Sequence, residues 1–221
     1  MSIKEALKKV QDSIESGVTL VAVSKTHAAD VVMQAYDEGV RIFGENKVQE
    51  MCAKAQCMPS DIEWHLIGHL QSNKIKYIAP FVSMIQSVDS MALLEKINAA
   101  AIKAGRVIDC LLEVHIASEE SKFGLTVEQA REIALSPSLK ELTGVRVRGL
   151  MTMASFTDDS EQIRKEFTAV KNLYDQIKEK NTAFDTLSMG MSGDYKIAMQ
   201  CGSTMVRVGS SIFGVRDYSS K

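Results

Sequence analysis

Apolar and polar positions along this chain fall into two alternating kinds of segment. Short runs rich in valine, isoleucine and leucine are followed by longer stretches in which apolar residues recur three or four positions apart. The first pattern is typical of buried strands and the second of amphipathic helices. The alternation repeats eight times with no break in composition, so the sequence predicts parallel strands joined by helices.

The predicted strands are short and evenly spaced, and glycine, proline or capping residues mark many of the helix ends. Strands are predicted over residues 19–25, 40–43, 62–67, 82–88, 108–116, 145–151, 186–189 and 205–208. Helices are predicted from the N-terminus to about residue 17, then over 30–38, 47–57, 72–78, 90–105, 126–137, from 160 onward, over 194–199 and after 210. Thr126 and Gln129 form a capping-box pattern at the start of one helix.

Eight strand–helix alternations predict an α/β fold, a single-domain (β/α)8 TIM barrel over residues 1–221 with one extra N-terminal helix. The alternative is an open, doubly wound sheet with insertions. The count of eight strands and their even spacing favour the barrel. In a barrel, the carboxyl ends of the strands converge on one mouth, where active sites lie.

Composition argues against several classes of protein. The chain has 221 residues, 45% of them hydrophobic, and a formal net charge of −2, with no basic block that would suggest a nucleic-acid surface. No apolar run approaches a membrane span, and the charged N-terminus lacks the apolar core of a signal peptide, so we expect a cytoplasmic protein. The four cysteines and four histidines show no metal-ligand spacing, so no metal is expected.

The first predicted strand ends on a lysine. The two-residue period of a strand places Thr19, Val21, Val23 and Lys25 on one face, and both faces are uncharged until Lys25. Burial disfavours the charged form of a lysine, which can then act as a nucleophile toward a carbonyl group. On this stretch alone, the alternative is a lysine that extends to the surface and caps the strand.

Two loops near the C-terminus carry residue types that hold phosphate. Residues 188–194 (SMGMSGD) follow the seventh predicted strand, and residues 209–211 (GSS) follow the eighth. Small residues let backbone amides approach an anion, serine hydroxyls add donors, and both loops precede a short helix. Loops after strands seven and eight are the usual phosphate position in this fold. A phosphate site opposite a nucleophilic lysine fits pyridoxal 5′-phosphate.

Three further polar residues are candidates for the same site. Arg207 is placed to donate to the ring nitrogen of the cofactor, which would weaken the cofactor as an electron sink; the alternative is a salt bridge. His65 could pack beside the ring, although a single histidine in such a strand is more often structural. Asn46 could hydrogen-bond the ring hydroxyl, although asparagine at the start of a loop is more often a cap.

The chain resembles the YggS/PROSC-like pyridoxal phosphate homeostasis proteins in these residues and in the motifs around them. Those proteins are similar to the N-terminal domain of alanine racemase. The resemblance runs from Val21 to Arg216. It is carried by motifs at residues 22–26 (AVSKT), 44–46 (GEN), 64–74 (WHLIGHLQSNK), 119–124 (EESKFG), 148–151 (RGLM), 187–192 (LSMGMS), 202–209 (GSTMVRVG) and 212–214 (IFG).

The resemblance implies that Lys25 carries pyridoxal phosphate as a Schiff base, the internal aldimine. It also implies that Ser188, Ser192, Gly209 and Ser210 surround the phosphate. The implied function lies in vitamin B6 homeostasis: the protein buffers the cofactor or delivers it, without turnover and therefore without catalytic residues.

The sequence departs from the family pattern at three places. His27 and the alanine after it stand where a lysine and a proline are usual, and His115 stands where strand five usually ends in asparagine. Gly193 interrupts a serine–aspartate pair in the phosphate loop. None of these departures removes an anchoring group, and His115 is the one that could alter the pocket floor.

The alternative function is an amino-acid racemase-like enzyme that uses the same lysine. Such racemases add a C-terminal β-domain whose tyrosine is the second base. The chain ends shortly after the eighth strand, with Tyr218 in a polar tail, so we expect the second base to be missing. A Schiff-base aldolase is disfavoured, because aldolase lysines usually lie on later strands and a sugar phosphate would not need Arg207.

The expected partners are small molecules and enzymes that use them. We expect a monomer that binds pyridoxal phosphate and related B6 vitamers. Apo forms of pyridoxal phosphate-dependent enzymes are candidate recipients of the cofactor. Neither nucleic acid nor a membrane is expected as a partner.

Overall fold

Eight parallel strands close into a barrel in the order β1 to β8. The computed structural model describes residues 1–117 and 123–214. The strands are β1 (Thr19–Val23), β2 (Ile42–Glu45), β3 (Glu63–Leu66), β4 (Met84–Val88), β5 (Ile108–His115), β6 (Val145–Met153), β7 (Thr186–Ser188) and β8 (Met205–Val208). The barrel closes where β8 pairs with β1, with Val21 opposite Arg207. The predicted TIM barrel is confirmed, and the open sheet is excluded.

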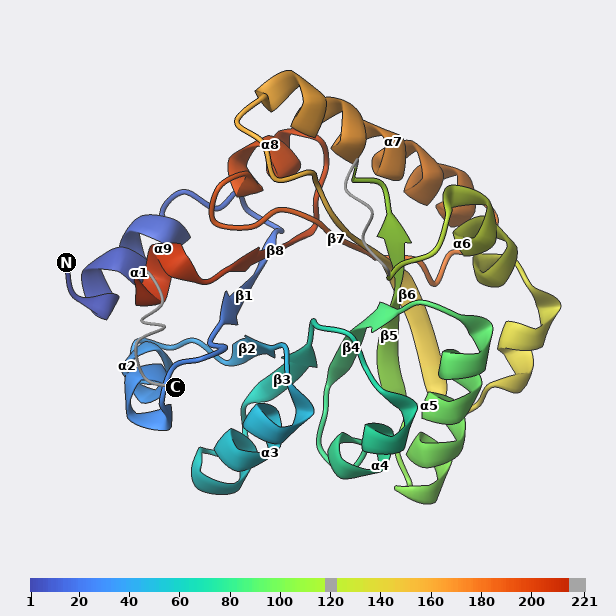
Figure 1. Ribbon diagram of the computed structural model, residues 1–221, viewed down its shortest axis with the longest axis horizontal. Coiled ribbons are helices and arrows are strands. Elements are labelled where there is room, and N and C mark those ends of the chain that lie inside the picture. The colour runs from blue at the N-terminus through green and yellow to red at the C-terminus, as the bar shows by residue number, and fades with distance from the viewer. Residues whose placement is uncertain (118–122, 215–221) are drawn as a thin grey trace.

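Helices follow the strands and surround the barrel (Figure 1). They are α1 (Ile3–Gln11), α2 (Ala29–Asp37), α3 (Val48–Cys57), α4 (Ile75–Ile78), α5 (Met91–Lys103), α6 (Val127–Ala134), α7 (Ser160–Lys178), α8 (Tyr195–Gln200) and α9 (Ser210–Phe213), with 3-10 turns η1 (Ser72–Lys74) and η2 (Pro137–Glu141). The extra N-terminal helix is α1, which packs beside α9 at the left of Figure 1. The two ends of the described chain therefore meet on one side of the barrel.

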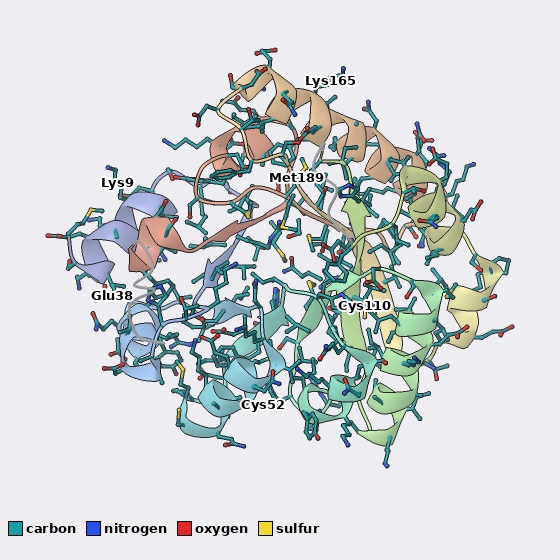
Figure 2. The ribbon with its side chains drawn as sticks, viewed as in Figure 1. Lys9, Glu38, Cys52, Cys110, Lys165 and Met189 are labelled. Atoms are coloured by element: carbon teal, nitrogen blue, oxygen red, sulfur yellow. The ribbon has the colours of Figure 1, made fainter. Side chains whose placement is uncertain are left out.

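Two apolar layers follow from the alternation of side chains along each strand. The inner layer, within the barrel, is Val21, Met84, Leu111, Met151 and Met205. The outer layer lies between the strands and the helices, and one continuous buried cluster joins them. Side chains fill the interior of the ring of strands in Figure 2, whereas Lys9, Glu38 and Lys165 lie at its periphery.

Several helix starts are determined by capping side chains. In the predicted capping box of α6, the hydroxyl of Thr126 accepts from the N–H of Gln129 at 3.2 Å, and the Gln129 side chain accepts from the Thr126 N–H at 2.9 Å. Ser2 and Glu5 form the same arrangement at the start of α1. Each pair satisfies backbone donors that a helix leaves free at its first turn.

Some element bounds differ from the prediction because the chain turns early. The strand predicted to end at Lys25 ends at Val23, since the Thr26 φ of 69° turns the backbone and the His27 N–H donates to the Ser24 carbonyl at 3.2 Å. Helix α1 ends at Gln11, well before residue 17. The strand predicted over 40–43 is shifted to Ile42–Glu45, where it pairs with β3.

Over the described residues, no helix combines the length and the apolar character needed to span a bilayer.

Candidate functional site

The carboxyl ends of the strands enclose a cavity of about 560 Å³, here called the mouth cavity. Its lining includes six of the eight predicted site residues: Lys25, Asn46, Ser192, Arg207, Gly209 and Ser210. A groove of about 620 Å³ beside α3 and α4 is slightly larger, but no strand residue contributes to its described lining. The mouth cavity is therefore the place where the predicted chemistry converges, at the end of the barrel where sites in this fold lie.

Lys25 reaches the mouth cavity because it continues the inward face of β1. Val21 belongs to the inner apolar layer, and Val23 lines the floor of the cavity. Lys25 is the next residue of that face, is half-buried, and also lines the cavity. The side chain of Lys25 therefore lies where a ligand within the cavity would meet it.

The two predicted phosphate loops meet at Ser192. The hydroxyl oxygen of Ser192 accepts from the N–H of Gly209 at 3.2 Å and from the N–H of Ser211 at 3.4 Å. These two backbone donors hold the Ser192 hydroxyl at the edge of the cavity, where it can donate its own proton to an anion. A Cβ at Gly209 would lie only 3.0 Å from the carbonyl oxygen of Val23, so a larger residue would press against the exit of β1.

Arg207 is a buried cation in the wall of the mouth cavity. Its Nη1 donates to the carbonyl oxygen of Ser188 at 2.9 Å and to the Ser188 hydroxyl at 2.7 Å, and its Nη2 donates to the carbonyl of Thr152 at 2.8 Å. Burial lowers the pKa of Arg207 to about 10, while the carboxylates of Asp194 and Glu113 oppose this shift. The guanidinium therefore keeps its charge at neutral pH.

His65 and Ser188 lie beneath the mouth cavity and are not among its described lining residues. Ser188 donates its hydroxyl proton to Oε1 of Gln86 at 2.7 Å, and Nε2 of Gln86 lies 2.9 Å from Nδ1 of His65. Burial lowers the pKa of His65 to about 4, so the ring is neutral at pH 7. The two residues thus belong to a buried chain of hydrogen bonds that runs from His65 through Gln86 and Ser188 to Arg207.

Three carboxyl groups, those of Glu113, Asp158 and Asp194, line the mouth cavity together with the cations. Burial is the main cause that raises the pKa of Glu113 to about 7, with Asp89 acting in the same direction and Arg207 against it. Burial also raises the pKa of Asp194, whose Oδ1 accepts from the N–H of Met191. The cavity therefore holds a carboxyl group, that of Glu113, whose charge changes near neutral pH.

The departures from the family pattern occupy different places. His27 lies against Phe213, with ring centroids 5.2 Å apart. His115 is the last residue of β5 and packs against Gly124, whereas Gly193 lines the mouth cavity. In the motif at residues 119–124, positions 119–122 lie outside the described residues, as does Tyr218.

Sequence reasoning missed several polar residues of the site. Gln86 and Glu113 are buried in the middle of strands, and Lys54 is buried on α3. For Gln86 and Glu113, the signal that could have found them is a polar residue within a predicted strand that is otherwise mostly apolar. Lys54 gave no such signal, because a lysine on an amphipathic helix normally faces solvent.

In the described part of the chain, no three His, Cys, Asp or Glu side chains are grouped as a metal site.

Comparison with known sequences gives a full-length match. The sequence model of the family described as "Alanine racemase, N-terminal domain" matches residues 1–217. A pyridoxal phosphate homeostasis protein of Pasteurella multocida is 37% identical over 234 residues, covering 99% of this chain and 100% of the relative. A protein of the same name from Bos taurus is 38% identical over 251 residues, covering 100% of this chain and 90% of the relative.

Solved structures share the fold over the same length. PipY of Synechococcus elongatus, determined with PLP bound, superposes with a TM-score of 0.88 at 35% identity, covering 96% of this chain and 100% of PipY. An alanine racemase of Clostridium difficile superposes with a TM-score of 0.80 at 18% identity, covering 99% of this chain and 58% of the racemase. At that identity, the racemase shows a common barrel and no more.

Proposed function

Because this chain belongs to the family of pyridoxal phosphate homeostasis proteins, we propose that it binds pyridoxal 5′-phosphate in the mouth cavity and holds it covalently on Lys25. The observation that carries the proposal is that an amine, a buried cation and two serine hydroxyls line one cavity. Lys25 supplies the amine, Arg207 the cation, and Ser192 and Ser210 the hydroxyls. PipY, which is 35% identical, was determined with PLP bound.

The residues of the mouth cavity fit the chemical groups of this cofactor. A volume of about 560 Å³ is in the usual range for a small-molecule site. The hydroxyls of Ser192 and Ser210 are donors suited to a dianionic phosphate, and the N–H groups of Gly209 and Ser211 hold the Ser192 hydroxyl in place. Arg207 is the proposed partner of the ring nitrogen, and Asn46 the proposed partner of the ring hydroxyl.

The cofactor supplies an aldehyde, which condenses with the amine of Lys25 to form a carbon–nitrogen double bond and release one water molecule. The protein's own groups bind and orient. Ser192 and Ser210 anchor the phosphate, while Arg207, held by the carbonyls of Ser188 and Thr152, keeps a fixed positive charge in the cavity wall. A charged guanidinium has no lone pair to accept a proton and gives one up only at high pH, so the ring nitrogen would stay unprotonated beside it.

The proposed role is reversible storage and delivery of the cofactor without turnover. The names of the relatives support this role, and an imine link that water can reverse suits a carrier. We propose that the protein acts as a cytoplasmic monomer, exchanges pyridoxal phosphate with related B6 vitamers, and passes it to apoenzymes. The racemase alternative has only the fold of distant racemases in its favour.

A spectroscopic titration tests the proposed function. Mixing the purified protein with pyridoxal phosphate should produce a visible absorption band that saturates at one cofactor per chain. Lys25→Ala should abolish this band. Lys47→Ala is the matched control, because Lys47 is exposed beside α3 and is absent from the described lining of the mouth cavity, so the band should persist. A band that survives in Lys25→Ala would refute covalent binding at this residue.

A further inference from the structure

A buried ionic cluster lies directly behind Lys25. It consists of Lys54 on α3, Glu45 at the end of β2 and Glu50 on α3, here called the Lys54 cluster. The ammonium of Lys54 lies 2.6 Å from Oε1 of Glu45 and 2.8 Å from Oε1 of Glu50. The side chain of Glu45 is fully buried and that of Lys54 is 6% exposed. Lysine and glutamate side chains are almost never buried this deeply unless they are paired.

The Lys54 cluster holds the peptide groups on both sides of Lys25. On the N-terminal side, Nζ of Lys54 donates to the carbonyl oxygen of Ser24 at 2.8 Å, and the Ser24 hydroxyl donates to Glu45 at 2.6 Å. On the C-terminal side, the N–H of Thr26 donates to Oε1 of Glu50 at 2.5 Å. One cluster therefore fixes both peptide planes that meet at the Cα of Lys25.

The backbone at this point adopts a costly conformation. Thr26 has a φ of 69°, which is unfavourable for a β-branched residue. A conformation of this kind persists only where surrounding contacts determine it, and such positions cluster at functional sites. Here the contact is the hydrogen bond from Thr26 to Glu50, which in turn is held by Lys54.

Stability alone gives no account of the Lys54 cluster. Oε2 of Glu45 is buried and makes no hydrogen bond within the described residues, and burial raises the pKa of Glu45 in spite of the nearby Lys54. Removing charges from water is costly in free energy, and well-packed apolar residues often replace such pairs without loss of stability. The geometry that the cluster imposes on Lys25 is a gain that an apolar replacement would not provide.

We propose that Lys54, with Glu45 and Glu50, is a positioning device that fixes the backbone of Lys25 so that its amine meets the cofactor aldehyde in the mouth cavity. The inference rests on the proposed function for the reaction at Lys25. It assigns the cluster no contact with the cofactor. Loss of Lys54 should therefore slow formation of the covalent link and leave the non-covalent binding of the ring and phosphate unchanged.

The test compares Lys54→Met with a matched control, Arg148→Met. Arg148 is also a partly buried cation, paired with Asp109 at 3.0 Å and Asp185 at 2.6 Å, but it lies near the opposite, N-terminal end of the strands. Stopped-flow mixing with pyridoxal phosphate should show a rate of link formation at least about tenfold slower in Lys54→Met, and unchanged in Arg148→Met. The affinity for pyridoxine 5′-phosphate, which lacks the aldehyde, should be unchanged in both variants.

A second readout needs no cofactor. In the apo-protein, Lys54→Met should speed hydrogen–deuterium exchange at the Thr26 amide, and Arg148→Met should not. Should Lys54→Met fail to fold, Glu50→Gln replaces it, because Gln keeps an acceptor for Thr26 but loses the charge that binds Lys54. We expect a smaller slowing in Glu50→Gln than in Lys54→Met.

The outcomes separate this inference from the proposed function. Absence of any covalent link at Lys25 in the wild-type protein would overturn both. A wild-type link with a wild-type rate in the Lys54 or Glu50 variant would overturn only the positioning role. Equal slowing in Arg148→Met would also overturn it, because the effect would then follow from lost stability rather than from position.

Discussion

Nη1 of Arg207 donates to both oxygen atoms of Ser188, the hydroxyl at 2.7 Å and the carbonyl at 2.9 Å. The Ser188 hydroxyl itself donates a hydrogen bond to Oε1 of Gln86, so Ser188 is fully engaged within the protein. The sequence resemblance implies that Ser188 surrounds the phosphate, whereas these contacts direct it toward Arg207. We therefore expect Ser188 to orient the arginine, and other groups to bind the phosphate.

Ser188→Ala should therefore lower the free energy of unfolding and have little effect on recognition of the phosphate. The change leaves Gln86 Oε1 and one Arg207 N–H without a buried partner, which costs about 1–3 kcal/mol in the free energy of unfolding. Denaturant unfolding measures this loss. The ratio of the affinities for pyridoxal phosphate and pyridoxal should stay at the wild-type value, and a large fall in that ratio would return Ser188 to the phosphate site.

Ser192 and Ser210 are expected to carry the phosphate contacts. A hydrogen bond to a charged group contributes about 1.5–3 kcal/mol. The double variant Ser192→Ala, Ser210→Ala should bind pyridoxal phosphate at least about tenfold more weakly, with little change for pyridoxal, which has no phosphate. Equilibrium titration of both ligands measures the difference. Wild-type affinity for pyridoxal phosphate in this variant would place the phosphate elsewhere.

The stability of the apo-protein should depend on pH through Glu113. Burial raises the pKa of Glu113 from 4.5 to about 7, so the folded state binds more protons than the unfolded state between these values. The contribution of this group to stability falls as pH rises from about 4.5 to 7 and stays low above that range. Glu113→Gln should therefore raise the free energy of unfolding at pH 8, by on the order of 1–3 kcal/mol.

The pH dependence itself supplies the control for Glu113→Gln. At pH 4.5, where the wild-type carboxyl group is largely protonated in the folded state, the two proteins should be about equally stable. Denaturant unfolding at both pH values measures the difference. A gain of equal size at both would show that the substitution acts through packing and not through charge.

The sequence predicted the barrel and most of the site because both follow from local patterns. Two-residue alternation along β1 places Lys25 on the inward face, and glycine–serine loops follow β7 and β8 in the structure as predicted. The position of Lys54 could not be predicted in the same way. Its burial depends on Glu45, at the end of β2, and on the carbonyl of Ser24, and neither contact leaves a periodic signal.

We expect no appreciable turnover of amino acids by the cofactor-bound protein. Arg207 keeps its positive charge at neutral pH, and an unprotonated ring nitrogen beside it would stabilise negative charge at the Cα of an amino acid only weakly. Solvent deuterium exchange at Cα of L-alanine measures this directly. The rate should not exceed that of Lys25→Ala. Fast exchange that is lost in Lys25→Ala, together with formation of D-alanine, would establish a racemase instead.

Reduction with borohydride followed by peptide mapping tests the central claim most directly. Borohydride converts the carbon–nitrogen double bond between the cofactor and a lysine into a stable single bond, so the labelled residue can be identified by mass spectrometry. We predict that the label appears on Lys25 at close to one equivalent per chain and that the visible absorption band disappears on reduction. A label on another lysine with Lys25 unmodified, or no label on a protein saturated with pyridoxal phosphate, would contradict the account.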